Sequence, residues 1–210
     1  MAQTSVAKVT AAANDFLARL DDKQRQSVIY AFDDDDQRRR WSNFPTGFIP
    51  RGGISLRSMT APQRAAAMAL LSNVLSARGY EKVQQIMEAD EVNKINEEKN
   101  PSGPPGRRNG APDGRRRNGP PPGAPPGPPP GAIRGPVSAA DMFGEDLYYI
   151  SFLGKPSDKD PWMLQFGGHH LALNITIAGE RGVAHSRLSS RSEAKPFGRS
   201  AMRATRRWRS

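Results

Sequence analysis

The side chains with the greatest capacity for chemistry in this sequence are two adjacent histidines, His169 and His170. Imidazole is a common metal ligand and an acid or base near neutral pH. If the surrounding residues form a strand, His169 shares an apolar face with Leu171. His170 then shares the more polar face with Asn174. We therefore predict that His169 is a buried, hydrogen-bonded core residue and that His170 is the candidate for a catalytic or metal-binding role.

Neighbouring residues of a strand point to opposite faces, so the two histidines can hold one metal ion only where the chain bulges. The simpler interpretation is that both belong to the core. Nearby carboxylates add little, because turn formation explains Asp146, Asp158 and Asp160. The absence of cysteine excludes disulfides, thiolate metal sites and thiol nucleophiles. The sequence thus indicates no particular cofactor.

Trp41 and Arg51 are further candidates for ligand binding, together with His169, His170 and Asn174, because they can line a pocket. Anchoring of a loop is the simpler role for Trp41 and Arg51.

Two other motifs do not support a site. The acidic run Asp33–Asp36 lacks the spaced ligands, central glycine and terminal glutamate of an EF-hand loop. The pairs Gly52-Gly53 and Gly167-Gly168 match no phosphate-binding motif.

Alternating apolar residues predict the strands that carry the histidines. The first is Leu147–Leu153, followed by a turn at 154–158. The second spans 162–166 and the third spans 169–177. We expect a short antiparallel β segment over residues 136–183.

Helical periodicity dominates the first 100 residues. Val6 to Leu20 repeat at helical spacing, and Asp21 with Gln24 resembles the capping box of a second helix. We expect that helix to carry Val28 and Ile29, and residues 33–58 to form a long ordered loop.

A third helix is expected to start at Thr60, with Gln63 as the capping partner. We predict that it runs to Arg78, where Gly79 supplies the C-terminal stop, and that an antiparallel helix follows through Ile95.

Proline and glycine make up more than half of residues 101–135, so this stretch cannot bury a core. We predict an α+β protein with a helical segment (1–100), a disordered Pro/Gly/Arg linker (101–135), a β-rich segment (136–183) and an unstructured basic tail (184–210).

The net charge of +10 lies in the linker and the tail, since the segments expected to fold are together close to neutral. Arginine-rich segments of this kind associate weakly and without specificity with nucleic acid. The high pI is therefore not predicted to belong to a folded surface.

Three stretches resemble the bacterial domain-of-unknown-function family 3500. They are LDDKQRQSVIYAFDDDDQRRRWSNFP, MTAPQRAAAMALLSNVLSARGYEKVQQIM and LYYISFLGKPSDKDPWMLQFGGHHLALNITI. The resemblance covers about 14–95 and 145–183, and its most specific part is the Trp…Phe-Gly-Gly-His-His-Leu block. It implies a mixed α+β fold and no particular activity.

The likeness is expected to stop after Val183, which is typical of a truncated or frameshifted family member. We expect residues 184–210 to be unstructured and to contribute little stability.

Two functions follow from these patterns. One is a ligand-binding or hydrolytic pocket near the His-His strand, so whether the protein is an enzyme stays open. The alternative is a nonenzymatic protein that binds acidic partners or nucleic acid through its arginine-rich linker and tail.

No apolar run approaches the ~20 residues of a membrane span. No signal peptide is present as written, although Ala2-Gln3 is typical of a site just after signal cleavage and favours export of intact relatives.

Overall fold

The computed structural model describes residues 5–40, 42, 44–100, 138–179, 181–188 and 203–204, the last two ranges by their backbone. Its helices are α1 (Ser5–Ala18), α2 (Asp22–Val28), α3 (Asp35–Arg39), the 3-10 helix η1 (Leu56–Ser58), α4 (Ala61–Val74), α5 (Ala77–Lys99) and α6 (Ala139–Met142). Its strands are β1 (Ile29–Tyr30), β2 (Ile54–Ser55), β3 (Tyr149–Leu153), β4 (Trp162–Gly167), β5 (Leu171–Ala178), β6 (Arg181–Leu188) and β7 (Arg203–Ala204).

The strands form one mixed sheet in the order β1-β3-β4-β5-β6-β7, with β2 also paired to β3. Strands β3, β4, β5 and β6 pair with one another in antiparallel fashion, whereas β1 is parallel to β3. The predicted α+β class is confirmed. The expected purely antiparallel segment is only part of this sheet, because β1 and β2 come from the N-terminal half.

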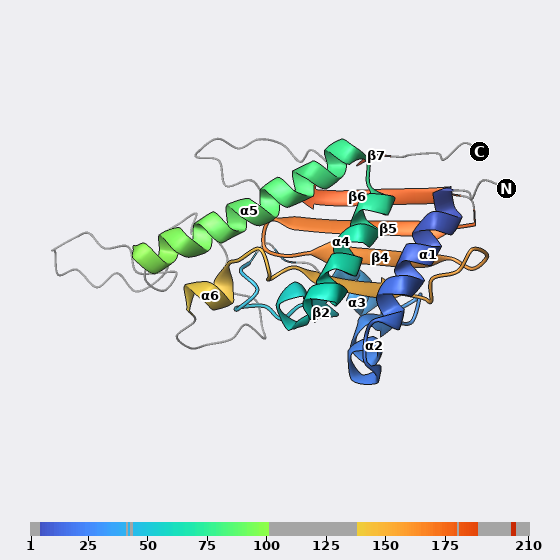
Figure 1. Ribbon diagram of the computed structural model, residues 1–210, viewed down its shortest axis with the longest axis horizontal. Helices are drawn as coiled ribbons and strands as arrows, with labels where there is room; N and C mark the ends of the chain where they lie inside the picture. Colours follow the sequence, from blue (N-terminus) through green and yellow to red (C-terminus); the bar gives the residue numbers. More distant parts are fainter. Residues whose placement is uncertain are drawn as a thin grey trace, which may run out of the picture.

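Helices α1 and α4 lie across one face of the sheet (Figure 1). Alternating strand residues turn their apolar side chains toward them, and Phe16 of α1 packs on Phe152 of β3 with ring centroids 6.0 Å apart. Buried residues of both halves of the chain, such as Phe16, Leu70 and Trp162, belong to one hydrophobic core. The helical and β-rich segments therefore depend on each other for burial.

The two capping boxes predicted from sequence are confirmed. The Asp21 side chain accepts from the Gln24 backbone N–H at the start of α2, and Thr60 does the same for Gln63 at α4. Helix α2 ends at Val28, however, because Ile29 adopts the extended backbone of β1 and pairs with β3.

The predicted stop of the third helix at Gly79 was wrong. Helix α4 ends at Val74, and Ser76 begins α5 by accepting a hydrogen bond from the backbone N–H of Gly79 at 3.2 Å. Gly79 therefore lies in the first turn of α5. Serine favours helix N-termini for this reason, and its signal outweighs that of the glycine.

Residues 33–58 are also more regular than the predicted loop, since they contain α3, β2 and η1. The aspartate run supplies the start of α3, where the Asp34 side chain accepts from the backbone N–H of Gln37 at 2.7 Å.

The β segment does not end at Val183, because β6 continues to Leu188 and pairs with β5 along its full length. The strand partner that β5 was expected to lack is therefore present. The prediction of an unstructured tail was wrong for residues 184–188. The predicted linker and the rest of the tail, apart from β7, lie outside the described residues.

Within the described part of the chain, no helix is long and apolar enough to cross a membrane.

Candidate functional site

The two histidines do not lie in a strand. They form the bend between β4 and β5, which is closed by a hydrogen bond from the Gly168 N–H to the Leu171 carbonyl at 2.9 Å. A Cβ on Gly168 would come within 3.0 Å of the Leu147 carbonyl and of the Tyr148 ring. The bend brings the rings of His169 and His170 together, with centroids 3.9 Å apart. The opposite-face prediction therefore does not apply to this pair.

His170 belongs to a buried polar cluster with Asp90 and Tyr148. Its Nδ1 contacts Asp90 Oδ1, and the Tyr148 hydroxyl donates to Asp90 Oδ2 at 2.6 Å. The Asp90 side chain is 2% exposed and that of His170 is 15% exposed. Burial, followed by the Asp90 charge, raises the pKa of Tyr148 well above its usual range, so this hydroxyl stays protonated and donates.

Asp90 and Tyr148 were missed by the sequence-based prediction. A signal was present for Asp90, because it follows Val83 and Met87 at helical spacing on the buried face of α5. A carboxylate on such a face requires polar partners. Tyr148 carried no comparable signal, since the predicted strand accounted for it.

His169 packs between the rings of His170 and Phe143, the latter with a centroid separation of 5.4 Å. Its Nδ1 is buried and has no hydrogen-bond partner among the described residues. Burial, and then the neighbouring His170, lower its pKa to about 4. His169 is therefore neutral at physiological pH.

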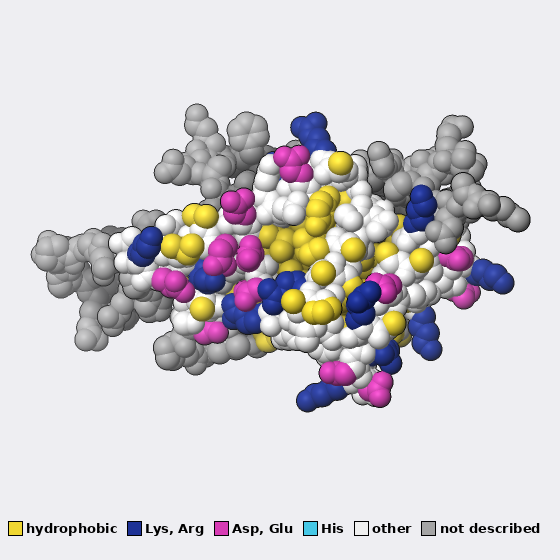
Figure 2. All heavy atoms as spheres, in the orientation of Figure 1, with side chains coloured by type: hydrophobic (Ala, Val, Ile, Leu, Met, Phe, Trp, Pro, Cys, Tyr) yellow, Lys and Arg dark blue, Asp and Glu magenta, His cyan; other side chains and the backbone are white. Residues whose placement is uncertain are grey.

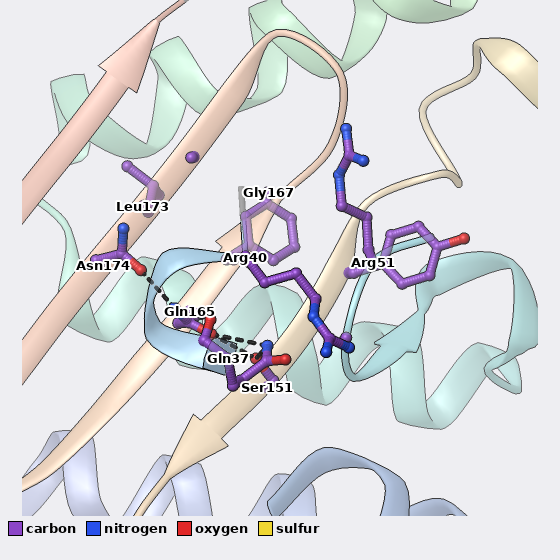
Figure 3. Close-up of a pocket in the computed structure, with 12 residues that line it drawn as sticks. Gln37, Arg40, Arg51, Ser151, Gln165, Gly167, Leu173 and Asn174 are labelled. Carbon is purple, nitrogen blue, oxygen red and sulfur yellow. Dashed lines mark hydrogen bonds between the residues drawn. The ribbon is translucent and has the colours of Figure 1, made fainter. Parts of the chain in front are cut away.

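A separate small pocket of about 40 Å³ lies on the face of the sheet opposite to α1 and α4, beneath α3 (Figure 3). Its lining comes from α3, the loop before β2 and three strands: Gln37, Arg40, Arg51, Gly52, Tyr149, Ser151, Gln165, Phe166, Gly167, Ala172, Leu173 and Asn174. Of the predicted ligand-binding residues, Arg51 and Asn174 line this pocket, but His169 and His170 do not. Trp41 lies outside the described residues.

A row of hydrogen-bonded polar side chains crosses the sheet at this pocket. Strand register places Ser151 opposite Gln165, and Gln165 opposite Asn174. Gln165 Nε2 donates to Asn174 Oδ1 at 2.9 Å, and its Oε1 accepts from Ser151 Oγ at 3.1 Å (Figure 3). Gln37 of α3 completes the row, because its Nε2 donates to Gln165 Oε1 at 3.0 Å.

The other amide atom of Gln37 is unsatisfied. Gln37 is 3% exposed, and its Oε1 accepts no hydrogen bond from the described residues. The amide fits there only because residue 52 is glycine, since a Cβ at Gly52 would overlap Gln37 Oε1. A buried unpaired acceptor costs about 1–3 kcal/mol, which a donor from a bound molecule would offset.

The pocket is electropositive. Arg51 donates to the carbonyls of Ile49, Ser42 and Phe44 at 2.6–2.7 Å, and no carboxylate of the described residues pairs with it. Burial lowers its pKa to about 10, which still leaves it protonated near neutral pH.

Arg40 is exposed at the pocket, and its guanidinium has no hydrogen bond or ion pair with the described residues. Figure 3 shows Arg40 extending over the end of the pocket that holds Gln37 and Ser151, while the Arg51 guanidinium points away from them. Arg40 is therefore the cation best placed to meet a ligand.

No group of three or more histidine, aspartate or glutamate side chains in the described residues is arranged to hold a metal ion. The Asp90–His170 pair alone provides too few ligands for the usual zinc sites.

The sequence matches the family described as "Protein of unknown function (DUF3500)" over residues 2–186, three residues beyond the end expected at Val183. No curated protein and no solved structure matches the chain.

Proposed function

The chain belongs to the DUF3500 family, and we propose that it binds a small carboxylate with an adjacent hydroxyl group in the pocket beneath α3. The observation that carries this proposal is the charge of the lining: the described residues that form it include Arg40 and Arg51 but no carboxylate. Guanidinium groups bind carboxylates strongly because they offer paired N–H donors with matching geometry.

The carboxamides of the lining favour a hydroxyl beside the charge. Gln37 Oε1 lacks a donor, and a small rotation of this flexible side chain would bring it to a ligand hydroxyl. Ser151 and Asn174 offer further polar groups in the same row. The cavity of about 40 Å³ holds only a small head group, so a larger molecule would have to extend past the exposed Arg40 into solvent.

The test compares three probes of similar size by calorimetry: glycolate, acetate and ethylene glycol. Glycolate has both groups, acetate lacks the hydroxyl, and ethylene glycol lacks the charge. We expect glycolate to bind about fivefold more tightly than acetate, the value of one net hydrogen bond of about 1 kcal/mol. Ethylene glycol should show no binding.

Arg40→Gln should weaken glycolate binding, whereas Arg39→Gln is the matched control. Arg39 is the last residue of α3 and the neighbour of Arg40, but it pairs with Asp35 at 2.9 Å and does not line the pocket. Equal affinity for all three probes, or equal losses in the two variants, would refute the proposal.

The alternative function depends on the arginine-rich linker and tail, which lie almost entirely outside the described residues, and it stays a prediction from sequence. On the face shown in Figure 2, the described Lys and Arg side chains are interspersed with Asp and Glu. This mixed surface does not favour nucleic-acid binding by the face shown, because such binding would need a continuous basic patch.

A further inference from the structure

We propose that His170 is a general base toward a bound water or hydroxyl group, with Asp90 as its positioning residue and Tyr148 as the support of Asp90. This inference goes beyond the carboxylate-binding pocket and does not depend on it, because His170 does not line that pocket.

The contact with an ionised Asp90 selects which nitrogen of His170 is free. When Asp90 is ionised its oxygens only accept hydrogen bonds, so its contact through Oδ1 with Nδ1 then requires a proton on Nδ1. The other oxygen of Asp90 is occupied by the Tyr148 hydroxyl at 2.6 Å, which fixes the orientation of the carboxylate. In that arrangement the lone pair of the neutral imidazole is on Nε2.

Burial differs between the two partners in the way that this role requires. The Asp90 side chain is 2% exposed, so water does not compete for its oxygens, whereas the His170 side chain retains 15% exposure. A buried carboxylate beside an imidazole orients the ring, selects its tautomer and stabilises the imidazolium that forms when Nε2 takes a proton.

A merely structural link between α5 and the bend would not need a charged group. Burying a carboxylate is costly, and a neutral hydrogen-bonding side chain can join two elements at lower cost. The pairing of a buried carboxylate at Asp90 with a titratable ring is typical of sites that transfer protons.

The reaction step balances without a further co-reactant. His170 Nε2 takes the proton of the attacking oxygen as that oxygen forms a bond to an electrophilic carbon. When the bond to the leaving group breaks, that group keeps the electron pair and receives the proton from Nε2. For a water nucleophile, the net reaction is hydrolysis.

The experiment uses the full chain and two readouts of the imidazole. Nitrogen-15 NMR identifies the tautomer, and diethyl pyrocarbonate measures the nucleophilicity of Nε2. In that reaction Nε2 bonds to a carbonyl carbon, ethyl carbonate leaves and the Nδ1 proton is lost. We expect the Nδ1–H tautomer and modification at His170. Mass spectrometry follows the modification, with His170→Gln and His169→Gln as reference variants.

Asp90→Asn should leave Nε2 protonated and slow the modification of His170 by about tenfold or more, because an amide can donate to Nδ1. Tyr148→Phe should give a smaller decrease. A purely structural role predicts no change in the His170 rate of a folded Asp90→Asn protein, and that result would overturn the proposal. If Asp90→Asn does not fold, the tautomer of His170 in the wild-type protein tests the proposal. An Nε2–H form would contradict the role of Nε2 as a base.

Discussion

At the scale of single residues, the pocket depends on one amide held between a helix and the sheet. Gln37 donates to Gln165 at 3.0 Å and to Ser151 at 3.3 Å, and the space for its amide is left by Gly52. The glycine at position 52 is therefore explained by packing against Gln37, since the backbone there does not adopt a positive φ.

Gly52→Ala tests this arrangement. The added methyl group would overlap the Gln37 amide, which is the mobile end of a flexible side chain, so the amide should move and the fold should persist. We expect a stability loss of about 1 kcal/mol and at least a severalfold loss of glycolate affinity. Chemical denaturation and calorimetry measure the two effects.

Gly79→Ala is the control because it lies in the first turn of α5, away from the pocket. It should leave glycolate affinity unchanged. Unchanged affinity in Gly52→Ala as well would show that the Gln37 amide does not contribute to binding.

His169 gives a second residue-scale prediction, on stability and pH. Its pKa is about 4 in the folded protein and close to 6.5 when unfolded, so the unfolded chain binds more protons between these values. The free energy of unfolding should therefore fall as the pH drops through this window, by about 2 kcal/mol between pH 7 and pH 5 from this residue alone.

Urea unfolding of wild type and His169→Gln at both pH values measures this contribution as a difference. The comparison is needed because charged neighbours, namely Asp90, Arg51 and His170, also influence the ring. The same loss on acidification in both proteins would mean that folding does not lower the pKa of His169.

At the scale of elements, β6 protects the edge of β5. The register runs from Leu171 opposite Leu188 to Ala178 opposite Arg181, so Val183 lies within the strand. Unpaired backbone groups at a sheet edge are destabilising when buried and promote aggregation when exposed.

Truncation after Val183 should therefore destabilise the protein, contrary to the expectation from sequence. It removes the β6 residues opposite Leu171–Ile175, and we expect a loss on the order of 2 kcal/mol or more, with increased aggregation. Thermal unfolding and light scattering provide the measurements. Truncation after Leu188 keeps the whole of β6 and is the matched control; equal losses from both truncations would contradict this role.

At the scale of the whole molecule, the two halves of the chain complete a single sheet and core. Tyr30 of β1 pairs with Leu153, and Ile54 of β2 pairs with Ile150. The apolar faces of α1 and α4 are buried against strands that follow them by many residues.

A fragment of residues 1–100 should consequently not fold on its own. We expect residual helical circular dichroism without a cooperative thermal transition, because Phe16 and Leu70 would lose their buried surroundings. Mixing with residues 138–210 should restore cooperativity. A sharp transition in the 1–100 fragment alone would show that the helices form an independent domain.

The sequence by itself determined the features that arise from local bonds and periodicity. Capping at Asp21 and Thr60 joins residues three positions apart, and the alternation in β4 and β5 follows from strand geometry. These signals do not require knowledge of the rest of the chain. The failure at Gly79 was also local, because a helix-start signal at Ser76 and a helix-stop signal at Gly79 competed within four residues.

Only the tertiary structure decided which polar groups meet. Asp90 lies 58 positions before Tyr148 and 80 before His170, while Gln37 lies 114 positions before Ser151. Such pairs are selected by the packing of α5 and α3 on the sheet, and burial then makes their hydrogen bonds obligatory. The histidines could be recognised from sequence as chemically capable. The bend that joins their rings and the carboxylate that orients His170 arise from the sheet and helix packing around them.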